Sequence, residues 1–144
     1  MLSNPQELIS TLKIQHRALQ ADLSIVQDEL TKGLSVKTDT VILALTKFRN
    51  DLIEHLKLEN NEFYPDYLDK KAKRGEDVSS TRDFIKQMED IGKTVMLFLD
   101  TYDNSAAVNT NLTVFSKALN GVISVLNTRI ETEEEGVFGL YLLL

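Results

Sequence analysis

Apolar residues recur at intervals of three and four positions along most of this 144-residue chain, and this spacing is the strongest constraint on its fold. Such spacing places the apolar side chains on one face of an α-helix. Four segments carry it: Leu8, Leu12, Leu19, Leu23, Val26 and Leu30; Val41, Leu45, Phe48, Leu52 and Phe63; Phe84, Met88, Ile91, Val95, Phe98 and Tyr102; and Leu112, Phe115, Leu119, Val122, Leu126, Ile130, Val137 and Leu140. The sequence therefore predicts four amphipathic helices.

Capping and turn residues predict where the four helices begin and end. Asparagine followed by proline is typical of a helix start, and glycine is typical of a helix stop. We expect Tyr64-Pro65 to end or kink the second helix, with a short helical tail behind it. The predicted helices run from Ser3-Asn4-Pro5 to Gly33, from Thr38-Asp39 to about Phe63 with a tail over Asp66 to Lys73, from Ser79 or Ser80 to Asp103-Asn104-Ser105, and from near Asn109 to the C-terminus.

These elements predict an all-α fold, an antiparallel up-down-up-down four-helix bundle that forms a single domain over residues 1–144. Helices of this length with short connections are typical of such bundles. The chain contains only two prolines, six glycines and no tryptophan, which favours long helices over a turn-rich β fold.

Four ionisable residues interrupt the apolar stripes: His16 in the first, His55 and Glu59 in the second, and Glu133 in the fourth. A buried carboxylate is costly unless it is paired or bound to a metal. In an antiparallel bundle, the rise of 1.5 Å per residue places all four residues within about two turns of one level. We therefore expect these side chains to share one layer of the core and to form a site.

The chemistry of these side chains indicates a metal site. His55 and Glu59 are four positions apart, so both leave the same helix face and can reach one ion. Without cysteine, imidazole and carboxylate are the usual ligands of iron, manganese and zinc. Inward-facing histidine and carboxylate ligands are a recurrent way to build metal sites in helix bundles.

The segment from Glu54 to Pro65 (EHLKLENNEFYP) resembles the HxxxE…(L/F)YP signature on the second helix of hemerythrin-like, or HHE cation-binding, domains. Gln15-His16-Arg17 is similar to the segment around the histidine of that family's first helix. The segment from Arg129 to Phe138 resembles its fourth-helix HIxxEExxxF pattern, with arginine where the family has histidine. The third helix, which supplies at least one histidine in the family, has none here.

The resemblance implies a non-haem di-iron site bridged by carboxylates, used to bind dioxygen or nitric oxide, to sense redox state or to handle iron. By position, His16, His55, Glu59 and Glu133 would be the metal ligands, and Glu59 and Glu133 the bridges. With this reduced ligand set, the site holds one metal ion, or two with water at open positions. Alternatively it is a metal-free remnant in which Arg129 pairs with Glu133 or Glu59, or the two glutamates lie exposed at the edge of the core.

Several other function classes find no support in the sequence. The net charge of −6 disfavours nucleic acid as a partner, and there is no cysteine, nucleophile elbow or glycine-rich phosphate loop. These absences predict a binding protein and not an enzyme. A histidine phosphotransfer module is disfavoured because such a module needs an exposed imidazole, whereas both histidines lie within apolar stripes. A metal-free bundle that acts in signalling or protein interaction stays as the alternative function.

The N-terminus lacks the basic segment and apolar run of a secretory signal, and no stretch reaches the 18 apolar residues of a membrane span. We therefore expect a cytoplasmic protein with no membrane partner. Its expected partners are a metal ion and a small diatomic ligand. The apolar tail from Leu140 to Leu144 can close the bundle or cover a neighbouring molecule, so we expect a monomer or a homodimer.

Overall fold

The computed structural model describes residues 4–144, and Ser3 of the predicted helix start lies outside this range. The described chain is helical throughout apart from its connections, and no strand forms in it. The predicted all-helical bundle is therefore confirmed. The α-helices are α1 (Pro5–Leu30), α2 (Thr38–Leu58), α3 (Tyr64–Lys73), α4 (Ser79–Thr101), α5 (Ser105–Asn109), α6 (Leu112–Thr132) and α7 (Phe138–Leu143), and π-helical turns span Glu59–Phe63 and Glu133–Val137.

Asparagine side chains cap three of these helices. The side-chain oxygen of Asn4 accepts a hydrogen bond from the backbone N–H of Glu7 at 2.8 Å, as the sequence predicted for the start of α1. Asn104 and Asn111 cap α5 and α6 in the same way. A short helix, α5, therefore separates α4 from α6, and the last long helix begins at Leu112 and not near Asn109.

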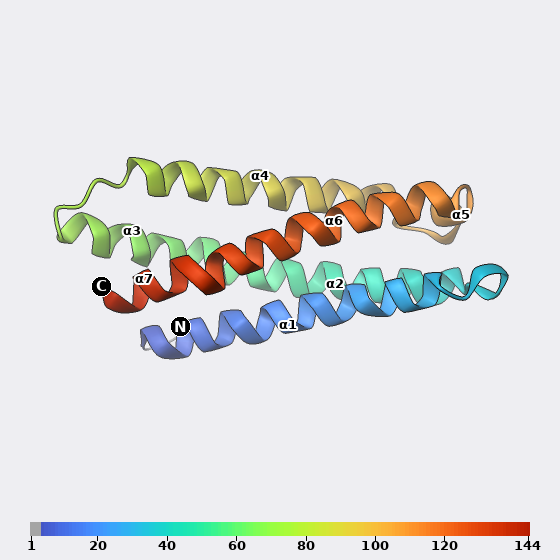
Figure 1. Cartoon of the computed structure of the whole chain (residues 1–144), viewed down its shortest axis with the longest axis horizontal. Coiled ribbons are helices and arrows are strands. Elements are labelled where there is room, and N and C mark those ends of the chain that lie inside the picture. Colours follow the sequence, from blue (N-terminus) through green and yellow to red (C-terminus); the bar gives the residue numbers. More distant parts are fainter. Residues whose placement is uncertain (1–3) are drawn as a thin grey trace.

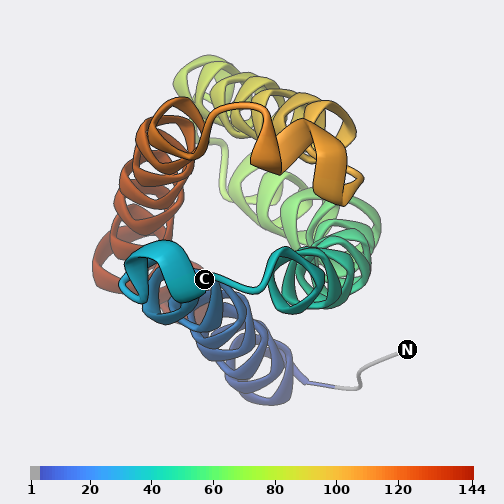
Figure 2. The same cartoon turned by 90° about the vertical axis from the view of Figure 1, so that its right-hand side faces the viewer.

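Figure 1 shows four long helical runs lying side by side, with α3 continuing α2 and α7 continuing α6. The turn between α1 and α2 lies at one end of the molecule, and both termini lie at the other (Figure 1). Viewed along the bundle, the runs surround a common interior (Figure 2). None of the helices in residues 4–144 is both long and apolar enough to cross a membrane.

Two apolar clusters fill the interior, one on each side of the candidate site. The larger cluster includes Phe48, Leu52, Phe115 and Leu126, towards the α1–α2 turn. The smaller one consists mainly of residues near the termini: Leu8, Ile9, Leu12, Phe63, Tyr64, Tyr67, Met88, Val137, Phe138 and Tyr141. Along α1, His16 lies between Leu12 of the smaller cluster and Leu19 of the larger one. The predicted polar layer therefore separates two dry regions of the core.

The two π-helical turns change which residues face the core behind them. Each inserts one residue relative to an α-helix, so the buried face shifts by one position. On the last helix, the sequence predicted Leu140 as a buried residue, but its side chain is 55% exposed and Tyr141 is buried in its place. On the second helix, the π-helical turn precedes Pro65, and the chain continues directly into α3. The helix therefore does not end at Tyr64-Pro65, and the expected helical tail is present.

We expect two glycine substitutions to change stability in opposite directions. Gly33 follows α1 with a φ of +58°, so Gly33→Ala should lower the free energy of unfolding by about 1 kcal/mol. Gly121 is an exposed residue inside α6 with open space around it, so Gly121→Ala should raise the free energy by about 0.5–1 kcal/mol. Urea unfolding followed by circular dichroism measures both. Equal effects of the two substitutions would contradict the left-handed turn at Gly33.

Candidate metal centre

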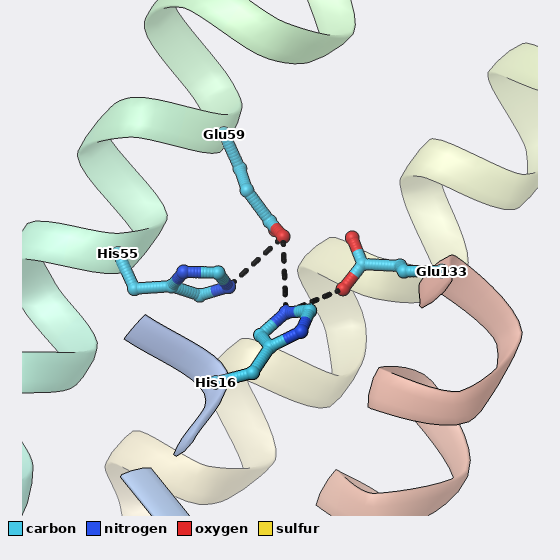
Figure 3. A group of neighbouring side chains, drawn as sticks. All are labelled: His16, His55, Glu59 and Glu133. Atoms are coloured by element: carbon cyan, nitrogen blue, oxygen red, sulfur yellow. Dashed lines mark ion pairs between the residues drawn. The ribbon is translucent and has the colours of Figure 1, made fainter. Parts of the chain in front are cut away.

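The four side chains that interrupt the apolar stripes meet in the middle of the bundle (Figure 3). His16 comes from α1, His55 from the last turn of α2, and Glu59 and Glu133 from the first residue of each π-helical turn. Their exposed fractions are 0% for His16, Glu59 and Glu133 and 2% for His55. The interpretation that the two glutamates lie exposed at the edge of the core is therefore wrong.

One nitrogen or oxygen atom from each side chain faces a common point, and these four atoms lie within 4.8 Å of one another. His55 Nε2 lies 2.9 Å from Glu59 Oε1. His16 Nε2 lies 3.3 Å from Glu133 Oε1 and 3.9 Å from Glu59 Oε1 (Figure 3). The shared layer predicted from helix rise is thus present in the structure.

Both imidazole rings are oriented by a hydrogen bond on the side away from this point. His16 Nδ1 lies 2.6 Å from Glu134 Oε2, and His55 Nδ1 lies 2.8 Å from Gln15 Oε1. A carboxylate oxygen and an amide oxygen only accept hydrogen bonds, so each Nδ1 carries a proton and donates it. In a neutral ring the Nε2 lone pair then points at the common point, as metal-binding histidines require.

Three of the four inward atoms have no hydrogen-bond partner. Among the described residues, the buried atoms without such a partner include His16 Nε2, Glu59 Oε1 and Glu133 Oε1. Buried polar atoms are nearly always satisfied, because an unsatisfied one costs about 1–3 kcal/mol. Here lone pairs of nitrogen and oxygen face one another across a dry space. A cation at the common point would satisfy all of them, so these residues fit a metal ion.

Arg129 lies on the far side of the two carboxylates and is only 3% exposed. Its Nη2 donates a hydrogen bond to Glu59 Oε2, and its Nε lies 3.7 Å from Glu133 Oε1. Its Nη1 donates to the backbone oxygen of Met88 on α4 at 3.3 Å. The guanidinium therefore contacts both glutamates and supplies positive charge next to them.

Burial and neighbouring charges give the two glutamates opposite properties. Burial acts to raise the pKa of Glu59, but the positive charge of Arg129, together with His55, holds it well below its usual range. Burial raises the pKa of Glu133 to about 7, and the nearby charge of Glu59 adds to this effect. Neighbouring positive charge therefore favours the ionised form of Glu59, whereas burial favours the protonated form of Glu133.

The two histidines also differ. Burial acts to lower the pKa of His16, but its contacts with Glu133 and Glu59 outweigh burial and raise the pKa to about 9. Burial lowers the pKa of His55, and the neighbouring Glu59 does not offset this. A proton on His16 Nε2 would lie where the inward lone pairs converge. This position therefore attracts a cation, and a proton there would compete with a metal ion.

Three further residues around the site were not identified from the sequence. Glu134 turns inward to His16 and is held there by a hydrogen bond from Arg17. Gln15 precedes His16 and reaches across to His55. Tyr64 is buried and donates a hydrogen bond to Glu133 Oε2 at 2.5 Å. Glu134 lies within one π-helical turn and Tyr64 directly follows the other, and no spacing rule in the sequence predicts those turns.

The burial of both histidines also bears on histidine phosphotransfer. Phosphorylation needs an imidazole nitrogen that a phosphodonor can reach, and neither ring is more than 2% exposed. Within the described residues, the structure thus offers no histidine suited to that role, in agreement with the sequence analysis.

Comparison with known proteins agrees with this geometry. The family model of the hemerythrin HHE cation-binding domain matches residues 7–141, which is nearly the whole chain. No curated protein and no solved structure matches the chain. The matched region contains all four inward-facing residues and Arg129. The chain therefore belongs to the hemerythrin HHE cation-binding domain family.

Proposed function

We propose that this protein binds non-haem iron through His16, His55, Glu59 and Glu133, and that it uses the metal to bind or sense a small ligand such as dioxygen or nitric oxide, or to handle iron. We propose further that it is a cytoplasmic binding protein and not an enzyme, a single domain with up-down-up-down helix order. One observation supports metal binding above all. Buried nitrogen and oxygen atoms of His16, Glu59 and Glu133 converge on one point without a hydrogen-bond partner among the described residues.

The donor set favours a transition metal. Two imidazole nitrogens and two carboxylate oxygens suit iron, manganese and zinc, whereas calcium and magnesium prefer oxygen donors alone. Four protein ligands leave room for an additional ligand on a metal that accepts five or six. Bound iron would supply an open coordination position for a small molecule.

The surrounding residues orient the ligands and keep water out. Gln15 and Glu134 hold the histidine rings through Nδ1, and Tyr64 holds Glu133 through Oε2. Phe138 stacks on the ring of His16, with the ring centroids 5.7 Å apart. Such outer contacts fix the direction of the ligand lone pairs before a metal arrives.

A metal-free bundle that acts in signalling or protein interaction is the second candidate function, and the charges of the site support it. With His16 protonated, His16 and Arg129 carry two positive charges that balance Glu59 and Glu133 when both are ionised. The layer would then be a buried ion network that specifies the bundle and needs no metal. Metal binding by glutamate variants and the pH dependence of stability distinguish the metal-binding function from the metal-free one.

If the protein binds metal, Glu59→Gln and Glu133→Gln should each reduce its affinity by more than roughly tenfold. Each change removes an anionic oxygen from the common point and nearly preserves the side-chain volume. Elemental analysis after reconstitution with Fe(II), Mn(II) or Zn(II) and gel filtration measures the bound metal. Glu131→Gln, at an exposed position on α6, is the matched control and should keep the metal. A wild-type protein with no bound metal after all three reconstitutions would exclude this function.

The pH dependence of stability should change sign with metal. The pKa of His16 is about 9 in the folded chain and near 6.5 when unfolded, so its proton stabilises the fold below pH 6.5, and this contribution disappears as pH rises through 9. The melting temperature of chelator-treated protein should therefore fall between pH 7 and 9.5. His16→Gln should abolish the fall. With metal present, deprotonated ligands bind best, so the melting temperature should rise over the lower part of this range.

The small-ligand part of the proposal has its own measurement. Fe(II)-loaded protein should gain visible absorption on exposure to nitric oxide or dioxygen, because the open coordination position accepts them. Glu133→Gln protein treated in the same way should show no such change. If neither gas changes the spectrum and iron passes readily to an external chelator, iron handling is the supported function instead.

A further inference from the structure

Helices α2 and α6 present the same arrangement to the core. On each, a long nitrogen-bearing side chain lies four residues before a buried glutamate, and that glutamate begins a π-helical turn. The pairs are His55 with Glu59 and Arg129 with Glu133. The two halves differ in chemistry only at the first member of each pair: a neutral imidazole can bind a metal, whereas a guanidinium carries no lone pair and cannot.

The two glutamates lie between two positions for positive charge. Glu59 directs Oε1 towards His55 and accepts a hydrogen bond from Arg129 at Oε2. Glu133 directs Oε1 between His16 Nε2 at 3.3 Å and Arg129 Nε at 3.7 Å. One position is the point where the histidines converge, and the guanidinium of Arg129 fills the other.

We propose that the site takes one divalent metal ion per chain, because Arg129 permanently occupies the position that a second cation would take. This inference rests on the proposed metal-binding function and concerns how many ions the site accepts. Arg129 is charged at every pH at which the protein is folded, so it cannot leave by deprotonation.

The surroundings of Arg129 hold it in this position. The backbone oxygen of Met88 accepts a hydrogen bond from Nη1, and Gly92 on α4 leaves space beside it, since a Cβ there would lie 4.0 Å from Nη1. The residues of α4 that face the interior at this level are Met88, Gly92 and Val95. None of their side chains contains nitrogen or oxygen, and the thioether sulfur of Met88 is only a weak acceptor. The buried residues of α4 next to Arg129 therefore offer no nitrogen or oxygen ligand to a second ion, and Asn60 and Glu89 line the pocket on the outer side of Arg129.

The net charge of the site also favours one metal ion per chain. The two carboxylates carry two negative charges, and Arg129 already neutralises one of them. A single divalent ion leaves a net charge of plus one on these groups. A second divalent ion would add two further uncompensated positive charges beside buried side chains, at a large electrostatic cost.

Metal stoichiometry tests the proposal on the full chain. Equilibrium dialysis of wild-type protein against Fe(II) without oxygen, or against Zn(II), should give one ion per chain. Arg129→His removes the permanent charge and adds a ligand, so its stoichiometry should rise above one. Arg49→His is the matched control, because Arg49 also pairs with a carboxylate, that of Asp100, but is not part of the site, and it should stay at one. Two ions in wild type, or no increase in Arg129→His, would overturn the proposal.

A measurement on the wild type alone covers the case in which Arg129→His does not fold. Protein loaded with Mn(II) should show the six-line electron paramagnetic resonance spectrum of an isolated ion. The multiline spectrum of an exchange-coupled pair would overturn the single-ion site and leave the proposed metal-binding function intact. Absence of bound metal in every reconstitution would instead refute the proposed function itself, so the two failures are distinguishable.

Discussion

The burial of two glutamates in the centre of the bundle is the constraint on which the rest of the structure depends. Moving one carboxylate out of water costs several kcal/mol even after the protein relaxes, and here two lie side by side at 0% exposure. The positive charge of Arg129 offsets part of this cost, because its guanidinium lies next to both carboxylates. On the other side, the histidines and their common point need a further positive charge. The layer is thus half satisfied by the chain itself and half by a proton or a metal ion.

The π-helical turns connect this layer to the apolar core. Each begins at a glutamate of the site and ends at the smaller apolar cluster, so one inserted residue sets both the direction of the carboxylate and the buried face behind it. The shift brings Tyr64 against Glu133 and turns Glu134 towards His16. Such turns weaken the local helix hydrogen bonding, and they are retained most often where function requires a particular side-chain direction.

Much of the fold and the membership of the site follow from spacing alone, whereas the detail of the site does not. Steps of three and four residues predict the long helices, and polar breaks in those steps identify His16, His55, Glu59 and Glu133. These are local patterns that one helix face determines. The inward turn of Glu134 and the burial of Tyr141 in place of Leu140 depend on an inserted residue that leaves no signature in the pattern. The contacts of Arg129 with both glutamates depend on how α2, α4 and α6 pack together. The sequence alone therefore could not decide whether Arg129 pairs with Glu59 or with Glu133.

The position of Arg129 determines which residues of the site are ionised. Arg129 holds the pKa of Glu59 well below its usual range and so favours its anionic form, whereas Glu133 with a pKa of about 7 and His16 with a pKa of about 9 hold protons that a metal ion would have to displace. The affinity for the proposed metal ion would then be linked to pH through Glu133 and His16. With metal bound as proposed, the permanent cation Arg129 would lower the number of ions and leave the remaining position sensitive to protons.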